Sequence, residues 1–367
     1  MGATARETAR FDSSHDAIEA FFSKPWSDGL PTVPPTAVLV HNMIAAGGRE
    51  ADAVVGSVPG RQLSLYVWQA ATCAVMAGCR PEYFPVVLAT WDALLAPRFN
   101  LHGVLSSTGG ASITAIVSGT YAEAIGMNSG TGAFGPGNRA NSTIGRAIRL
   151  GALTALQAIP GGLDASSYGH GGKYGFHFAE SPPPAPWRSI REQLGFPAHA
   201  TTVTVMSTEA PRQVMHRWNP SADDMLRTLA SPMKDPSQNA TGSEAVYIVV
   251  LGPEHADVLI SAGLSQAQVR QKLSILSAVT PAELAAGGIR YDDPGTRYGK
   301  PDAQGKILTA RPEHILVMTA GGAGAGWSMV IPPLTWIKSF LPSTRPVRLP
   351  GEAPIERDAA AAELDFA

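Results

Sequence analysis

The chain has 367 residues, which is too long for one small domain and favours two domains or one large α/β body. Charged residues make up only 16% of the chain and the formal net charge is −2, so the sequence lacks the basic surface that nucleic-acid binding requires. The chain is also rich in turn residues, with 38 glycines and 30 prolines. Because its surface is short of charge, we expect a homo-oligomer, with a loop-rich monomer as the alternative.

The cysteines and the N-terminus give expectations about the compartment. Cys73 and Cys79 are too few for a disulfide framework. The N-terminal segment has no apolar signal core, and the Met-Gly start does not fit the myristoylation pattern because Arg6 stands where Ser or Thr is needed. No apolar run reaches about 18 residues, so we expect no membrane span. These features together predict a reduced, cytoplasmic protein.

Residues 1–36 are expected to form an extended N-terminal arm. A short helix over Asp16–Phe22 precedes Ser27–Thr36, where proline and glycine favour extended backbone. Such an arm is expected to lie across another surface or another subunit.

Residues 37–185 are expected to form a first α/β lobe. Pro81 at a first helical position and the β-branched run Ser112–Ser118 are the clearest signals in it. The Pro-rich segment Ser181–Trp187 marks its end. The predicted helices are 37–46, 61–78, 81–95 and 138–157, and the predicted strands are 101–105, 112–118 and 174–179.

Residues 195–345 are expected to form a second α/β lobe, and residues 346–367 a mobile, acidic, Ala-rich tail. Capping boxes at Ser265 and Thr280 each predict the start of a helix. The predicted strands are 201–206, 245–251 and 315–319, and the predicted helices are 221–230, 265–277 and those that start at 253 and 280. The fold class is therefore α/β, a two-lobed mixed fold with glycine-rich ligand loops.

The segment Gly126–Leu150 carries the strongest functional signal of the sequence. Its glycines let the backbone approach a ligand closely, and successive peptide N–H groups before a helix can form an anion-binding nest. The helix that follows adds arginines, whose planar guanidinium groups pair with carboxylate or phosphate. The expected substrate-binding residues, including two from a second glycine loop, are Asn128, Ser129, Gly130, Gly132, Asn138, Arg139, Asn141, Arg146, Gly322 and Gly324.

The alternative is that these glycines form only turns. The first loop has no Gly-Lys-Ser/Thr ending, so it is not a phosphate loop of that type. GxGxxG occurs at 130–135, but no clear strand runs into it and a proline follows, which argues against a dinucleotide site. The second loop, Gly321–Gly326, follows a predicted buried strand, and it either completes the same cleft or is a tight crossover.

Cys79 is the expected nucleophile or thiol base. It lies beside Arg80 at the expected start of a helix, and both features lower the pKa of a thiol. Cys73 lies among alanine and valine in a predicted helix and is typical of a packed core thiol. An inert free thiol is the alternative for Cys79 as well.

Proton transfer is assigned to His102 or to the group of His170, Lys173 and Tyr174. These residues lie in glycine-rich or strand-edge segments, and a hydrogen-bonded loop histidine is the alternative for each imidazole. The sequence has no Cys/His cluster with the spacing of a zinc site, so we expect no metal and no organic cofactor.

Several segments resemble an uncharacterised bacterial family often found beside proteins that carry a Sec/Cys-Gly-Ser-Cys (UGSC) motif. The matching segments are 27–36, 74–89, 99–104, 126–150, 169–180 and 252–270. One departure is His177, which stands where the family has a cysteine. The resemblance implies that the family pattern includes Cys79, Asn128, Asn138, Arg139, Asn141, Arg146, Lys173, Tyr174 and Glu180.

These observations predict an enzyme that acts on a small carboxylate or acyl-type anion by bond cleavage or by addition and elimination, as a lyase or hydrolase. One alternative is a subunit of a thiol-redox complex with a Sec/Cys-containing partner protein, which the neighbourhood of the family suggests. Another is a non-catalytic protein that binds a small anion.

Overall fold

The computed structural model describes residues 8–217, 221–235, 246–290, 300–324, 326–334 and 341–364. Its core consists of two mixed β-sheets, so the fold is α/β as expected. The first sheet has the order β10-β5-β3-β4 and the second the order β6-β9-β7-β8. The strands are β1 Val54–Val58 and β2 Leu63–Tyr66, which form a separate hairpin, and β3 Ser112–Ser118, β4 Phe176–Ala179, β5 Thr202–Thr208, β6 Arg212–Met215, β7 Tyr247–Leu251, β8 Ile315–Thr319, β9 Trp327–Ile331 and β10 Ser343–Pro346.

The two sheets repeat one topology. In each, an inner strand runs parallel to an edge strand and antiparallel to the strand on its other side: β3 with β4 and β5, and β7 with β8 and β9. The fourth strand of each sheet follows the three strands of the other sheet in sequence. Strand β6 follows β5 in sequence but pairs with β9, and β10 follows β9 but pairs with β5. The two repeats, β3 to β6 and β7 to β10, therefore exchange their last strands.

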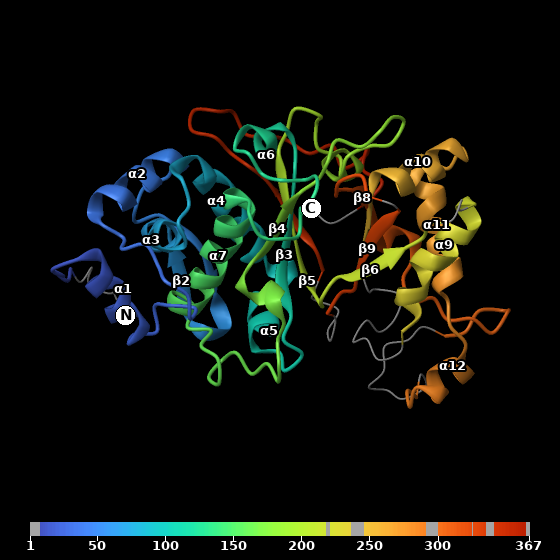
Figure 1. Cartoon of the computed structure of the whole chain (residues 1–367), viewed down its shortest axis with the longest axis horizontal. Helices are drawn as coiled ribbons and strands as arrows, with labels where there is room; N and C mark the ends of the chain where they lie inside the picture. Colours follow the sequence, from blue (N-terminus) through green and yellow to red (C-terminus); the bar gives the residue numbers. More distant parts are fainter. Residues whose placement is uncertain are drawn as a thin grey trace.

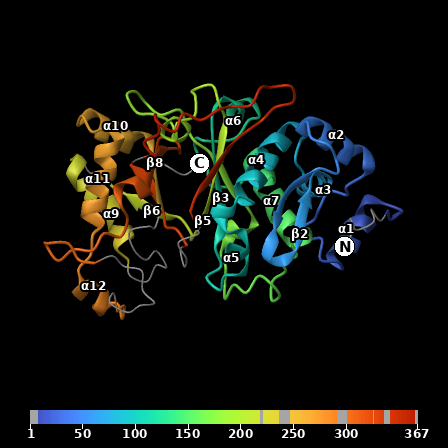
Figure 2. The same ribbon diagram turned by 180° about the vertical axis from the view of Figure 1, so that it is seen from behind.

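The sheets pack face to face, with helices on the outer face of each (Figure 1 and, from behind, Figure 2). Alternate residues of a strand point to opposite faces. In β3, Ala115 and Val117 join the core beneath the helices, whereas Ile116 joins a core that also contains Ile248 and Leu316 of the second sheet. The molecule therefore has four layers: helices, sheet, sheet, helices.

The helices that cover the first sheet come from the first half of the chain, and those that cover the second sheet from the second half. On the first sheet lie α2 Ala37–Gly47, α3 Val67–Ala77, α4 Phe84–Leu94 and α7 Arg139–Thr154; on the second lie α9 Ala222–Ala230, α10 Pro253–Ser261 and α11 Gln266–Ser277. The remaining helices are α1 Ser14–Phe22, α5 Leu101–Ser106, α6 Thr120–Ala124, α8 Ile190–Gln193 and α12 Pro281–Ala286.

Local signals explain where several helices begin. Ser265 and Thr280 cap α11 and α12 with the reciprocal hydrogen bonds that the sequence predicted. The expected strand at 101–105 is wrong: this segment is α5, because Asn100 takes a left-handed conformation and its side chain accepts from the Gly103 N–H. The helix expected from residue 61 begins only at Val67, since the residues before it pair with β1.

The residues that form each sheet do not follow the limits predicted for the two lobes. Strand β5 lies in the expected second lobe of 195–345 but pairs with β3, and β10 also belongs to the first sheet. The tail expected to be mobile instead packs on the body. Leu364 is 2% exposed, and Glu363 forms ion pairs with Arg188 and Arg270.

Candidate functional site

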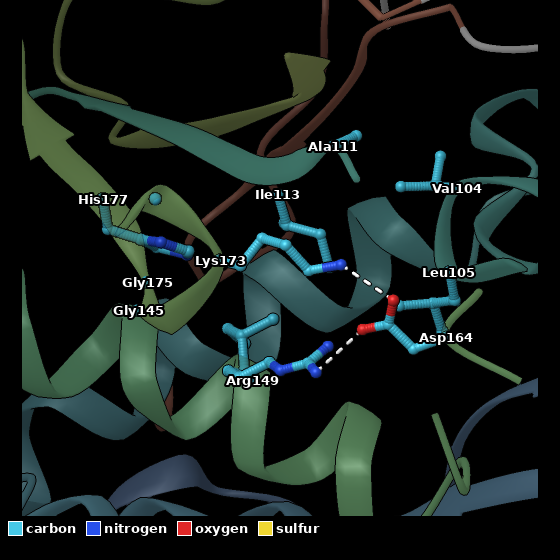
Figure 3. Close-up of a pocket in the computed structure, with 12 residues that line it drawn as sticks. Val104, Leu105, Ala111, Ile113, Gly145, Arg149, Asp164, Lys173, Gly175 and His177 are labelled. Carbon is cyan, nitrogen blue, oxygen red and sulfur yellow. Dashed lines mark hydrogen bonds and ion pairs between the residues drawn. The ribbon is translucent and has the colours of Figure 1, made fainter. Parts of the chain in front are cut away.

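A narrow cavity lies in the first half of the chain, between α5, α7 and the strands β3 and β4 (Figure 3). Its interior has room for about one water molecule, and its empty volume is about 390 Å³ when the open mouth is included. Most of its wall is apolar. The residues that line it are Val104, Leu105, Ala111, Ile113, Gly145, Ile148, Arg149, Asp164, Gly172, Lys173, Gly175 and His177.

A buried carboxylate lies between two cations at this cavity. Asp164 pairs with Arg149 and with Lys173, each at an N–O distance of 2.9 Å, and its side chain is only 4% exposed. Burial alone would raise its pKa, but hydrogen bonds from Ser166 and Lys173 and the charges of Lys173 and Arg149 lower the pKa to about 2. Two positive charges thus share one negative charge.

His177 forms another part of the wall. The imidazole is buried, and neither nitrogen has a hydrogen-bond partner among the described residues. Burial lowers its pKa to about 3, so the ring is neutral at physiological pH. Gly145 makes room for it, since a Cβ there would lie 3.0 Å from His177 Nδ1. Gly175 lets the backbone approach α7 closely, since a Cβ at Gly175 would lie 2.5 Å from the carbonyl carbon of Gly145.

Of the expected proton-transferring residues, Lys173 lines the cavity and the others lie beside it or outside. His170 precedes the 3₁₀ turn η4 (Gly171–Tyr174), and its Nδ1 accepts from the Gly172 N–H. Burial is the main cause that lowers the His170 pKa. Tyr174 is 52% exposed, and His102 is exposed on α5. The structure therefore gathers Lys173 and His170 on one turn but does not bring His102 to them.

The asparagines of the first glycine loop support the loop itself. Asn138 caps α7 by accepting from the Asn141 N–H, and it donates to the Gly126 carbonyl. Asn141 exchanges hydrogen bonds with the backbone of Asn128, and the Asn128 side-chain Oδ1 accepts from the Gly130 N–H. These side chains are thus engaged in shaping the loop.

The two glycine loops touch each other. The Ser129 carbonyl accepts from the Gly321 N–H, and a Cβ at Gly322 would lie 1.9 Å from Thr131 Oγ1. In the second loop, the Gly324 N–H donates to Glu254. The first loop, including Gly132, does not line the cavity of Figure 3. It also does not line a second, open groove, which lies between Tyr121 of α6 and Leu349 of the C-terminal segment.

The arginines of α7 do not converge on the glycine loop, which corrects the expected anion site. Arg139 donates from Nε to the Gly78 carbonyl at 3.0 Å. Arg146 holds the N-terminal arm through two hydrogen bonds of 2.8 Å to Asp28. Arg149 pairs with Asp164 in the cavity wall. The three side chains thus bind three different segments.

Both thiols are buried, and the expected lowering of the Cys79 pKa is wrong. Burial raises the pKa of Cys79 to about 12, against smaller lowering effects of Thr143 and Arg139, and it raises that of Cys73 to about 11. Cys79 precedes a 3₁₀ turn at Pro81 rather than an α-helix, so the favourable helix terminus is also missing there.

A buried serine–histidine pair in the second half of the chain escaped sequence analysis. His255 Nδ1 and Ser328 Oγ are 2.7 Å apart, and His255 Nε2 lies 3.1 Å from the His216 carbonyl. Ser328 Oγ also accepts from the Gly252 N–H. Both side chains are buried with their polar atoms partnered, so the pair joins β7, α10 and β9.

Asp164 is the main site residue that sequence reasoning missed. Its partners Arg149, on α7, and Lys173, on η4, lie 15 and 9 residues away in sequence, so no short spacing motif indicates the cluster. The available signal for His177 was a histidine in the buried, otherwise apolar strand Phe176–Ala179.

Comparison with known proteins gives no family assignment: no family model matches the chain, and no curated protein matches it in sequence. In the described part of the chain, no helix is long and apolar enough to cross a membrane. The same residues contain no group of three His, Cys, Asp or Glu side chains arranged to hold a metal ion.

Proposed function

We propose that this protein is an enzyme that binds a small carboxylate or acyl-type anion in the cavity of Figure 3 and promotes bond cleavage or addition and elimination there. The observation that carries the proposal is the shared carboxylate: among the described residues that line the cavity, Asp164 is the one acidic side chain, and both Arg149 and Lys173 pair with it. The remaining positive charge favours an anionic ligand.

The surroundings of these charges strengthen the argument. The wall is mostly apolar, with Ile113, Ile148 and Leu105 beside the charged groups, and electrostatic attraction is stronger where water is excluded. A short hydrocarbon chain would contact these apolar side chains, while its carboxylate would meet the cations. The enclosed part of the cavity has room for only about one water-sized group, so a ligand of a few carbon atoms would place one polar group there and extend into the open mouth.

Lys173 is the proposed acid–base residue. Its side chain lines the cavity and is 18% exposed. Asp164 and Ser166 orient it through hydrogen bonds. An oriented ammonium group can donate a proton to a leaving oxygen or stabilise a developing negative charge.

The thiol-redox alternative has less support, because such a subunit needs an accessible thiol and both thiols are buried. A non-catalytic binding protein would use the same cavity and is distinguished only by the absence of turnover.

The test measures binding and turnover separately. Carboxylates of two to four carbons are titrated by calorimetry, and the same compounds are followed by proton NMR in D₂O for cleavage or for exchange at carbon. Wild type is expected to bind, and Lys173→Met to lose at least about tenfold in affinity, which is 1.4 kcal/mol. The turnover rate of Lys173→Met is expected to fall by a larger factor than its affinity, because Lys173 is also the proposed acid–base residue.

Lys272→Met is the matched control, since Lys272 is also ion-paired, to Asp223, but lies far from the cavity in the second half of the chain. Equal affinities of wild type and Lys173→Met would contradict the proposed site. Binding without any reaction of the panel would favour the non-catalytic alternative.

A further inference from the structure

His177 is a buried polar side chain that the fold does not satisfy. It is 4% exposed, it lines the cavity, and both of its ring nitrogens lack a hydrogen-bond partner among the described residues. Leaving such groups unpaired destabilises a folded protein, so buried polar atoms are almost always partnered. A phenylalanine of similar shape would fill this place without that cost.

Another histidine of the same chain shows what a structural role looks like. His255 is 1% exposed, and its two nitrogens lie within hydrogen-bond distance of Ser328 Oγ and of the His216 carbonyl. His177 has no such contacts, although it is buried to a similar degree. The difference indicates that the partner of His177 is not among the residues that the structure describes.

The position of His177 limits the size of that partner. The imidazole lies against Gly145, and Arg149 is one turn further along the same face of α7. One helical turn is about 5.4 Å. The imidazole and the charged group of Arg149, Lys173 and Asp164 line the same cavity, whose enclosed part is about the size of one water molecule, so a molecule that contacts both must be short and must extend into the open mouth.

We propose that His177 hydrogen-bonds a hydroxyl or carbonyl oxygen of the substrate, which makes the substrate a short carboxylic acid with an oxygen function on its second or third carbon. This inference rests on the proposed function, because Lys173 and Arg149 hold the carboxylate in it. The neutral imidazole suits the task, since one ring nitrogen donates a hydrogen bond and the other accepts one.

The test compares matched pairs of acids that differ in one oxygen: lactate with propionate, pyruvate with propionate, and 3-hydroxybutyrate with butyrate. Affinities are measured by calorimetry for wild type, His177→Phe and His177→Gln. Wild type is expected to bind at least one oxygenated acid tenfold or more tightly than its partner. His177→Phe is expected to bind both members of that pair equally, and His177→Gln to keep part of the preference.

Thermal melting separates this role from a structural one. Because His177→Phe removes two unpaired polar atoms, its melting temperature is expected to equal or exceed that of wild type. A marked fall in the His177→Phe melting temperature, with the preference retained in His177→Gln at wild-type strength, would assign His177 to packing and overturn the inference.

The outcomes also separate the two proposals. If wild type binds carboxylates through Lys173 but does not discriminate within any pair, the role of His177 is wrong and the proposed function stands. If wild type binds none of the acids, the proposed function fails and the inference fails with it.

Discussion

At the scale of single residues, burial outweighs sequence neighbours in setting the chemistry of this protein. Cys79 has Arg80 next to it in sequence, yet its thiol has a raised pKa because the side chain is covered. Asp164 is covered as well, but Ser166 and Lys173 hydrogen-bond it and its pKa falls. The balance between burial and the hydrogen bonds and charges in direct contact decides in which direction the pKa of a buried group shifts.

The pH dependence of stability tests this balance at Glu180. Burial raises its pKa from the usual 4.5 to about 7, while hydrogen bonds from Ser118 and the Ile190 N–H and the charge of Arg191 oppose the shift and Glu192 adds to it. The protonated form is thus favoured in the folded state. Its contribution to stability is fully present below about pH 4.5 and is lost as the pH rises through 7.

We therefore expect the free energy of unfolding of wild type to fall between pH 5 and pH 7.5, relative to Glu180→Gln, by up to about 3 kcal/mol. Urea denaturation of both proteins across this range measures the difference. A difference that is constant with pH, or that grows in favour of wild type at high pH, would contradict the assigned shift.

At the scale of elements, α7 is the organising helix of the first half. Its N-cap holds the glycine loop, Arg146 holds the N-terminal arm, and Arg149 contributes to the cavity. The sequence predicted this helix and its arginines from their pattern. It did not predict their partners, because Asp28 is 118 residues away and only tertiary packing brings it to Arg146.

The arm provides a test at this scale. Asp28→Asn keeps the side-chain shape but removes the charge that pairs with Arg146, and we expect a loss of about 2 kcal/mol because both side chains are largely buried. The arm should then be released more often. Cleavage by chymotrypsin after the exposed Phe22 is expected to accelerate severalfold.

Asp12→Asn is the control for this experiment, since Asp12 lies exposed in the same arm. If both variants are cleaved at the wild-type rate, the ion pair does not hold the arm. A loss of carboxylate binding in Asp28→Asn with the arm still protected would instead return Arg146 to the ligand site.

At the scale of the whole molecule, the sequence predicted the strands better than their pairing. The limits of β3 match the prediction because a β-branched run between glycines marks a strand locally. No local sequence signal predicts the exchange of β6 and β10, because the pairing of each strand depends on which sheet edge it contacts in the folded protein. For the same reason, Lys173 could be named from the sequence but its shared partner Asp164 could not. The homo-oligomer and the cytoplasmic location stay predictions.

The C-terminal segment offers a test at this scale, because it was expected to be mobile. Leu364 is 2% exposed, so Leu364→Ala is expected to lower the free energy of unfolding by about 2–3 kcal/mol. Ile275→Ala is the control, since Ile275 is 59% exposed and its loss should cost far less. Equal urea midpoints for the two variants would show that the tail is not packed in solution.

The exchange of β6 and β10 also limits how far this chain can fold while it is being synthesised. Thr204 of β5 hydrogen-bonds its cross-strand partner Thr344, which lies 140 residues later, so the first sheet lacks one strand until the residues of β10 have been made. Contacts that distant in sequence are slow to form. Neither half is then a self-sufficient folding unit, and a nascent chain halted anywhere before residue 343 would keep an unpaired sheet edge that invites association with other chains.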